Sequence, residues 1–308
     1  MKLISIVTPC FNEEENVQEL YDRIKNVMAG FDYNYEHIFI DNASTDRTIE
    51  LLRELGSQDK HVKVIVNTRN FGHIRSPYYG LLQAQGDAVV VLASDLQDPP
   101  ERISDFIQKW EEGYKIVIGV KTQSQEAGLF YFMRTMFYRV LRKLSDVELI
   151  EHFTGFGLYD QQVIGILRSL NDPYPYFRGL IAEIGFPIAR IEFVQPLRKH
   201  GITKNNFYTL YDMAMLGFTS YTKIPLRLAA MLGFLTAGMS FLVGLAYLIY
   251  KLIFWAKFSV GLAPAVIGLF FLGAVQLIFL GIIGEYISAI YIHVTRRPLV
   301  IEKERINF

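Results

Sequence analysis

Three short segments in the N-terminal half of the chain bring together acidic, amide and hydroxyl side chains. They are residues 9–14, 41–46 and 94–100, and each directly follows a run of apolar residues typical of a buried strand. Carboxylate and amide oxygens are the ligands that Mg²⁺ and Mn²⁺ prefer. The sequence has neither a Gly-x-Gly-x-x-Gly segment after the first run nor a Walker sequence to hold phosphates. These segments therefore predict that a divalent cation, Mg²⁺ or Mn²⁺, binds the phosphates of a substrate.

The elements that must position these segments alternate along the first 121 residues. Five β-rich runs are separated by amphipathic helical patterns, which predicts an α/β fold with a doubly wound, mainly parallel sheet. In such sheets ligands bind outside the carboxyl ends of the strands, where all three segments lie. The predicted strands are residues 3–8, 36–40, 62–67, 88–92 and 115–120. The predicted helices are residues 13–28, 46–55 and 74–85, the first with Asn12 as its N-cap.

Composition divides the chain of 308 residues into two unlike parts. The 31 Lys and Arg residues balance 31 Asp and Glu residues, so the net charge does not indicate a nucleic-acid partner. The single cysteine, Cys10, excludes an internal disulfide and any cysteine-based zinc site. Hydrophobic residues make up 51% of the chain and are concentrated between Leu226 and Ile292. The charged residues in this stretch are Arg227, Lys251, Lys257 and Glu285.

Two apolar runs, residues 226–250 and 262–283, are each long enough to cross a hydrocarbon core of about 30 Å as a helix. The alternative, a buried helical hairpin, would need much more surrounding protein. Two spans return the chain to its starting side, and basic residues follow the second span. The positive-inside tendency makes that side the cytoplasmic face of the inner membrane, although Lys251 and Lys257 in the connecting loop count weakly against this orientation. The basic residues are Arg296, Arg297, Lys303 and Arg305.

We predict three parts along the chain. Residues 1–204 form a cytoplasmic α/β domain without an export signal, and residues 226–308 form a hairpin of two membrane helices with a short cytoplasmic tail. Residues 205–225 between them carry one apolar helical stripe, which suits a helix lying on the membrane surface. An ordinary amphipathic helix packed on the α/β domain is the alternative. The stripe consists of Phe207, Leu210, Tyr211, Ala214, Phe218 and Tyr221.

The order of these segments resembles that of family 2 glycosyltransferases of the polyprenyl-phosphate kind, which include dolichol-phosphate mannose synthases and bactoprenol glucosyltransferases. The resemblance covers nearly the whole chain. It implies a GT-A-like fold and the inverting transfer of one sugar from a nucleotide sugar to a polyprenyl phosphate such as undecaprenyl phosphate. A UDP-sugar is the favoured donor and a GDP-sugar the alternative, and the lipid-linked sugar would serve cell-envelope glycosylation. The matching segments are Pro9-x-Phe11-Asn12-Glu13-Glu14, residues 41–46, Asn70-Phe71-Gly72, residues 94–100 and Gly284-Glu285-Tyr286-Ile287.

The resemblance also implies roles for individual residues. Asp95 and Gln97 would hold the metal. Arg198 and Lys204 match basic residues that contact the diphosphate, so these two and Asp95 are the predicted catalytic residues. The alternative for Arg198 and Lys204 is a juxtamembrane basic cluster attracted to anionic lipid. The predicted nucleotide-sugar-binding residues are Pro9, Phe11, Glu13, Asp41, Asn42 and Lys121.

The acceptor phosphate is expected near a cationic amphipathic helix predicted over residues 129–144. Arg134 and Arg139 on this helix are the predicted acceptor ligands, and a solvated basic face is the alternative. A phosphate monoester has a second pKa of about 6, so it is already ionised near neutrality and needs little proton abstraction. The reaction needs instead that this dianion is positioned against the anomeric carbon and that charge on the leaving diphosphate is neutralised.

Four positions depart from the family's pattern. Asn42 stands where an aspartate is usual, and an amide changes which edge of a base can be bound, so the nucleotide stays open. Ala93 replaces the first acidic residue of the metal motif Asp-x-Asp-Leu-Gln. Lys121 replaces an arginine and lacks its bidentate fork. Gly155 occupies the position of a proposed catalytic base and cannot take that role.

Other functions remain as alternatives. A processive polysaccharide synthase is disfavoured because the sequence has no Gln-x-x-Arg-Trp segment. A non-catalytic membrane module is motivated by three of these departures, Ala93, Asn42 and Gly155, and donor-dependent sugar transfer would exclude it. A transporter or lipid flippase would need a pathway that two spans do not provide within one subunit. A homo-oligomer, such as a tetramer, is plausible because small residues allow membrane helices to approach closely. These residues are Gly233, Ala237, Gly281 and Gly284.

Overall fold

The computed structural model describes residues 1–122, 150, 153–196, 215–217, 219–254 and 262–308. Its strands are β1 (Leu3–Cys10), β2 (Asn34–Asp41), β3 (Val62–Asn67), β4 (Ala88–Val91), β5 (Ile116–Lys121), β6 (Phe153–Asp160), β7 (Ile188–Phe193) and β8 (Glu302–Ile306). They form one eight-stranded sheet in the order β7-β5-β6-β4-β1-β2-β3-β8. The β4, β1, β2 and β3 strands are parallel to one another, as are β5 and β7. Because only β6 and β8 among the described strands run antiparallel to their neighbours, the predicted mainly parallel α/β fold is confirmed.

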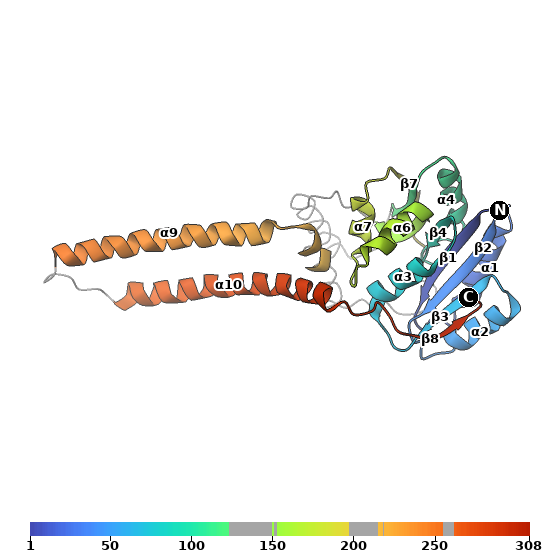
Figure 1. Cartoon of the computed structure of the whole chain (residues 1–308), viewed down its shortest axis with the longest axis horizontal. Helices are drawn as coiled ribbons and strands as arrows, with labels where there is room; N and C mark the ends of the chain where they lie inside the picture. Colours follow the sequence, from blue (N-terminus) through green and yellow to red (C-terminus); the bar gives the residue numbers. More distant parts are fainter. Residues whose placement is uncertain (123–149, 151–152, 197–214, 218, 255–261) are drawn as a thin grey trace.

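Helices cover both faces of this sheet (Figure 1). They are α1 (Val17–Met28), α2 (Thr48–Gln58), α3 (Gly72–Gln83), α4 (Arg102–Glu111), α6 (Gln161–Leu170) and α7 (Phe177–Glu183). One apolar core joins α1, α2 and α4 to the sheet, and a second core joins α3, α6 and α7 to the opposite face. In β1, Ile4 and Ile6 belong to the first core and Val7 to the second, and all three are wholly buried. Burial on both faces explains why the central strands read as nearly continuous apolar runs.

The first helix begins later than the sequence predicts. α1 starts at Val17 with Asn16 as its N-cap, not at residue 13 after Asn12. Asn12 has a φ of 57°, which is a left-handed conformation and ends β1 in a sharp turn. The next amide, of Glu13, donates to Thr48 Oγ1 at 2.8 Å instead of starting a helix. The β1–α1 connection is therefore a loop held against the start of α2.

Two long helices extend away from the α/β domain as a hairpin (Figure 1). They are α9 (Ile224–Ile253) and α10 (Leu262–Thr295). The 30 residues of α9 span about 45 Å at about 1.5 Å per residue, more than the core of a bilayer. The mean hydropathy reaches 2.0 in α9 and 1.9 in residues 268–295, and these apolar stretches are not buried by the described chain. Both helices are thus long and apolar enough to cross a membrane.

The tail after α10 returns to the α/β domain as the edge strand β8. It pairs antiparallel with β3, where Val64 is opposite Ile306 and Ile65 is opposite Arg305. Thr68 N also donates to Ile301 O at 2.9 Å. The tail predicted within residues 226–308 is therefore part of the sheet of the N-terminal domain, so the chain on both sides of the hairpin is anchored to that domain.

The predicted interfacial segment, residues 205–225, lies mostly outside the described residues. Residues 215–217 and 219–221 are helical where the structure describes them. The ring of Tyr221 lies 5.8 Å from that of Tyr176, and Tyr286 Oη of α10 donates to Thr222 O at 2.7 Å. The start of the hairpin is therefore in contact with both the α/β domain and α10.

Candidate active site

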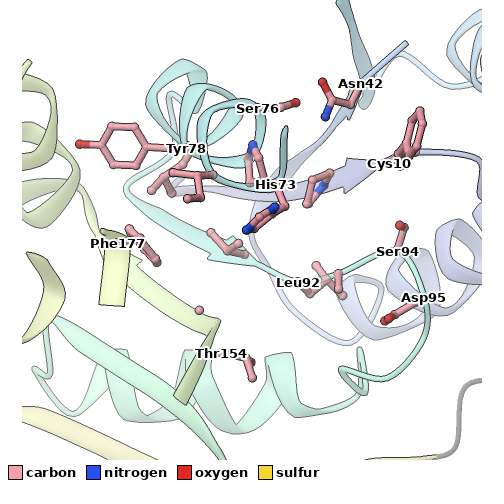
Figure 2. Close-up of a pocket in the computed structure, with 18 of the residues that line it drawn as sticks. Cys10, Asn42, His73, Ser76, Tyr78, Leu92, Ser94, Asp95, Thr154 and Phe177 are labelled. Carbon is pink, nitrogen blue, oxygen red and sulfur yellow. The ribbon is translucent and has the colours of Figure 1, made fainter. Parts of the chain in front are cut away.

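A pocket of about 660 Å³ lies outside the carboxyl ends of β1, β2 and β4. This is the edge at which doubly wound sheets bind their ligands, and the volume lies within the range of small-molecule sites. Figure 2 shows Asn42 and Ser76 on one side of the pocket and Ser94 and Asp95 on the other. All three polar segments found in the sequence contribute to its lining.

The β1–α1 loop forms one wall of the pocket with Pro9, Phe11 and Glu13. The Glu13 carboxylate accepts a hydrogen bond from Asn16 Nδ2 at 2.7 Å, which turns it toward the start of α1. Asn12 Oδ1 accepts from Thr45 N at 2.8 Å and so ties this loop to the connection after β2. The structure therefore places these three predicted nucleotide-binding residues at the pocket.

Asp41 and Asn42 end β2 but lie in different surroundings. Asp41 is wholly buried, and its carboxylate accepts from Ser44 Oγ at 2.5 Å and from Ser44 N at 3.0 Å. Burial raises the pKa of Asp41, and the hydrogen bonds from Ser44 only partly oppose this effect. Asn42 lines the pocket. Of the predicted acidic and amide pair, Asn42 thus faces the cavity, while Asp41 shapes the turn behind it.

The turn after β4 carries the predicted metal ligands. Asp95 and Gln97 both line the pocket, and Asp95 Oδ1 accepts from Gln97 N at 3.1 Å. Leu96 between them has a φ of 58°, an uncommon conformation for a bulky residue and typical of strained functional turns. This left-handed residue lets the side chains on both sides of it reach the same cavity.

Asp98 is a third oxygen donor in this turn and was not predicted as a site residue. It is buried, lines the pocket and accepts from Ala93 N at 3.2 Å. The pKa of Asp98 is raised to about 6, and burial is the largest cause of this shift. The charge of Lys121 opposes the shift, while the charge of Asp95 adds to it. Lys121 at the end of β5 therefore lies close enough to the acidic turn to act on it. The spacing of three residues from Asp95 is the sequence signal that could have identified Asp98.

Gly155 in β6 lines the pocket at the position where the resemblance implies a base. Its φ is 106°, a conformation that L-residues with side chains rarely adopt, and its carbonyl accepts from Tyr159 Oη at 2.8 Å. A Cβ atom here would lie 3.6 Å from Phe177 Cδ1. An aspartate at this position would need a different backbone conformation, so the conformation of this strand favours glycine at position 155.

The remaining wall comes from residues that lie outside the matching segments. The start of α3 contributes His73, Ile74 and Pro77, and the segment before and within α7 contributes Tyr176 and Arg178. These residues could not be grouped from the sequence because the two sets lie about 100 positions apart. Only the packing of α3 and α7 on the same face of the sheet brings them together.

The sequence profile of glycosyl transferase family 2 matches residues 5–167. The matched region contains the four central parallel strands and the three polar segments that line the pocket. The chain belongs to glycosyl transferase family 2.

Related glycosyltransferases match nearly the whole chain. The glycosyltransferase YkcC of Bacillus subtilis (strain 168) is 40% identical over 299 residues, which cover 96% of this chain and 92% of the relative. The bactoprenol glucosyl transferase of Shigella phage SfII is 34% identical over 302 residues, covering 98% and 97%. The predicted family is confirmed by these relatives. A solved structure of glucosyl-3-phosphoglycerate synthase from Mycobacterium tuberculosis, with Mn²⁺, UDP-glucose and phosphoglyceric acid, has a TM-score of 0.47 and 20% identity, covering 71% and 78%.

The turn after β4 gives the glycosyltransferase a donor set that fits Mg²⁺ or Mn²⁺. Asp95, Gln97 and Asp98 present carboxylate and amide oxygens to one cavity, and these hard ligands suit either ion. Among the described residues, no group of three or more His, Cys, Asp and Glu side chains is arranged to hold a metal. Two or three protein oxygens leave coordination positions for water and for substrate phosphates, as Mg²⁺ usually requires.

Four predicted site residues of the glycosyltransferase lie outside the described residues. They are Arg134 and Arg139, predicted to bind the acceptor phosphate, and Arg198 and Lys204, predicted to contact the diphosphate. Their roles stay predictions.

Proposed function

We propose that this glycosyltransferase moves one sugar, with inversion, from a nucleotide sugar to a polyprenyl phosphate such as undecaprenyl phosphate. The observation that carries the proposal is the match to bactoprenol glucosyl transferases over nearly the whole chain, including both apolar helices. A soluble acceptor would not require these helices, whereas a polyprenyl phosphate resides in a membrane. The product would be a lipid-linked sugar for glycosylation of the cell envelope.

The donor would bind across the carboxyl ends of β1, β2 and β4. Pro9, Phe11, Glu13 and Asn42 would line the nucleoside, with Asp41 supporting the turn behind it. A UDP-sugar is the favoured donor and a GDP-sugar the alternative. The donor diphosphate would then reach the acidic turn.

At the acidic turn, Asp95 and Gln97 would hold Mg²⁺ or Mn²⁺, and the bound ion would supply positive charge that neutralises the diphosphate. Lys121 would add a positive charge from the end of β5, where it already lowers the pKa of Asp98. Arg198 and Lys204 would contact the same diphosphate.

The chemical step would be a direct displacement. A phosphate oxygen of the lipid forms a bond to the anomeric carbon, while the bond from that carbon to the diphosphate oxygen breaks and the nucleoside diphosphate leaves with the electron pair. Arg134 and Arg139 would hold the attacking phosphate. Because that phosphate is already ionised near neutrality, no protein base is needed, which agrees with glycine at position 155.

The α/β domain would lie in the cytoplasm, with α9 and α10 in the inner membrane. The charged β8 strand packs on the α/β domain, so the chain before α9 and the chain after α10 lie on the same side. Basic residues after α10 support the cytoplasm as that side by the positive-inside tendency.

The proposal is tested by incubating the purified full chain with undecaprenyl phosphate and a panel of labelled UDP- and GDP-sugars. The expected result is lipid-linked label from one donor, lost with EDTA and restored by Mg²⁺ or Mn²⁺, with the anomeric configuration inverted in the product. Donor-dependent label on a soluble acceptor but not on the lipid, or retained configuration, would overturn the proposal.

A further inference from the structure

The side-chain amide of Asn42 holds the loop that follows β3. Its Nδ2 atom donates to Asn70 Oδ1 at 2.9 Å and to Gly72 O at 3.2 Å. Its Oδ1 atom accepts from Phe71 N at 2.9 Å and from Asn67 Nδ2 at 3.2 Å. An asparagine amide has two donor hydrogens and two acceptor lone pairs, so these four bonds use its full capacity.

Two backbone groups determine which position of this amide is the oxygen and which is the nitrogen. Phe71 N can only donate, so it must face the amide oxygen, and Gly72 O can only accept, so it must face the amide nitrogen. The amide is therefore held in one orientation by the loop itself. No donor or acceptor of Asn42 is left for the edge of a nucleotide base.

The same network extends behind the pocket into α3. Asn67, which is 1% exposed, donates from Nδ2 both to Asn42 Oδ1 and to Ser76 Oγ, the latter at 3.0 Å. Figure 2 shows the Ser76 hydroxyl on the side of α3 that faces Asn42. Gly72 N donates to Asn70 Oδ1 at 2.8 Å and closes the loop on itself. The ends of β2 and β3 and the start of α3 are thus joined through buried amides.

We propose that Asn42 is a positioning residue: its amide fixes residues 70–72 as a wall of the nucleotide pocket, and the base is not read through position 42. The statement about the base rests on the proposed nucleotide-sugar donor, whereas the anchoring of residues 70–72 does not. Asn70 and Gly72 line the pocket together with Asn42, so a change in the anchor changes the shape of the wall.

The chemistry of the anchor requires an amide. A carboxylate in place of Asn42 would direct an acceptor oxygen at Gly72 O and at Asn70 Oδ1, which are themselves acceptors. Both donated bonds would be lost and two pairs of oxygens would repel each other. The bonds from Phe71 N and Asn67 Nδ2 would survive, so Asn42→Asp removes the donating half of the anchor.

Hydrogen exchange of the full chain in detergent tests the anchor without any ligand. In Asn42→Asp, peptides that span residues 68–74 should exchange faster by about ten-fold or more, because the loop opens more readily, while peptides from β1 and α4 keep the wild-type rate. Asn12→Asp is the matched control, since it adds the same charge to the same pocket while its oxygen keeps the bond from Thr45 N. That variant should leave exchange at residues 68–74 unchanged.

Dissociation constants of UDP and GDP, measured by calorimetry on the same proteins, test the second part. Asn42→Asp should weaken the binding of whichever nucleotides the wild type binds by one common factor of about ten or more, beyond the loss seen in Asn12→Asp.

A wild-type exchange rate at residues 68–74 in Asn42→Asp would overturn the role of Asn42 as an anchor. A ratio of UDP to GDP affinity that changes more than about three-fold would overturn the claim that position 42 does not read the base. The exchange result stands apart from the donor class, so failure of the anchor and failure of the proposed function are distinguishable.

Discussion

At the scale of single residues, His37 in β2 is a buried histidine outside the pocket. Its side chain is fully enclosed, Nε2 lies 3.0 Å from Thr8 Oγ1, and its ring centroid lies 3.8 Å from that of Phe39. Burial lowers the pKa of His37 from its ordinary value near 6.5 to about 3. The folded protein therefore keeps this imidazole neutral at pH values where the unfolded chain would protonate it.

This histidine predicts a loss of stability as the pH falls below 6.5. The unfolded state binds the proton first, so the contribution of His37 is complete above pH 6.5 and declines toward pH 3. Between pH 6.5 and 5 the loss should be about 1.5 kcal/mol, and His37→Gln should remove it. The measurement is the free energy of unfolding in detergent at both pH values. Equal pH dependence in the wild type and His37→Gln would contradict this reading.

The site residues show how far residue types alone predict roles. Asp95 and Gln97 reach the pocket as expected, because a carboxylate and an amide that follow a buried parallel strand have little choice of edge. The bonding of Asn42 could not be predicted, since its partners at residues 70–72 lie 28 to 30 positions away. Asp41 shows the same limit, because only the turn at Ser44 decides that its carboxylate points away from the cavity.

At the scale of elements, β8 is the strand that joins the end of the chain to the rest of the sheet. Asn307 directly after it donates from Nδ2 to Gly56 O at 2.6 Å and to Val62 O at 2.8 Å. Arg53 pairs with Glu304 at 2.6 Å, but both side chains are substantially exposed, so this ion pair contributes little. The partly buried amide of Asn307 is therefore expected to contribute more to docking β8 than this ion pair does.

Substitution of Asn307 tests this docking. Asn307→Gly removes these two hydrogen bonds and the exposed one that Lys60 Nζ donates to Asn307 Oδ1 at 3.1 Å, while glycine adopts the φ of 61° without strain. We expect the free energy of unfolding to fall by about 1 to 2 kcal/mol, because two buried carbonyls lose a donor. Lys303→Ala, at an exposed position of the same strand, should change it by less than about 0.5 kcal/mol. Equal thermal midpoints for the two variants would rule this role out.

The strands differ in how readily they can be predicted from the sequence. The central strands were predicted to within a few residues because burial on both faces makes them continuous apolar runs. β8 reads Glu-Lys-Glu-Arg-Ile and was missed, since an edge strand with charged side chains carries no apolar signal. β6 was also missed, because glycines at positions 155 and 157 interrupt its apolar pattern, and glycine is depleted in strands.

At the scale of the whole molecule, the hairpin is inserted into the fold and not appended to it. The chain leaves the α/β domain before α9 and returns after α10 to complete the same sheet through β8 (Figure 1). The connections before α9 and after α10 both hold the α/β domain. Together they restrict rotation of the pocket relative to the membrane more than a single connection would. This arrangement suits an enzyme whose acceptor stays in the bilayer.

The proposed orientation predicts which ends of the hairpin are reachable from outside the cell. Phe254 lies at the far end of α9, and Lys303 lies in β8 on the α/β domain. A membrane-impermeant maleimide should label Phe254→Cys in intact cells and Lys303→Cys only after permeabilisation. The wild type is the blank, because Cys10 is its only cysteine and is 2% exposed. Labelling of Lys303→Cys in intact cells would show the opposite orientation.

The central claim is that the turn after β4 holds the metal for sugar transfer. The most direct measurement is the rate of label transfer to undecaprenyl phosphate by Asp95→Asn, together with Mn²⁺ binding followed by electron paramagnetic resonance. Asp105→Asn on α4 is the control, since it makes the same change on a partly exposed carboxylate that is paired with Arg102 outside the pocket. We predict that Asp95→Asn loses transfer by about 100-fold or more and binds Mn²⁺ weakly, while Asp105→Asn matches the wild type. Wild-type transfer by Asp95→Asn would contradict the account.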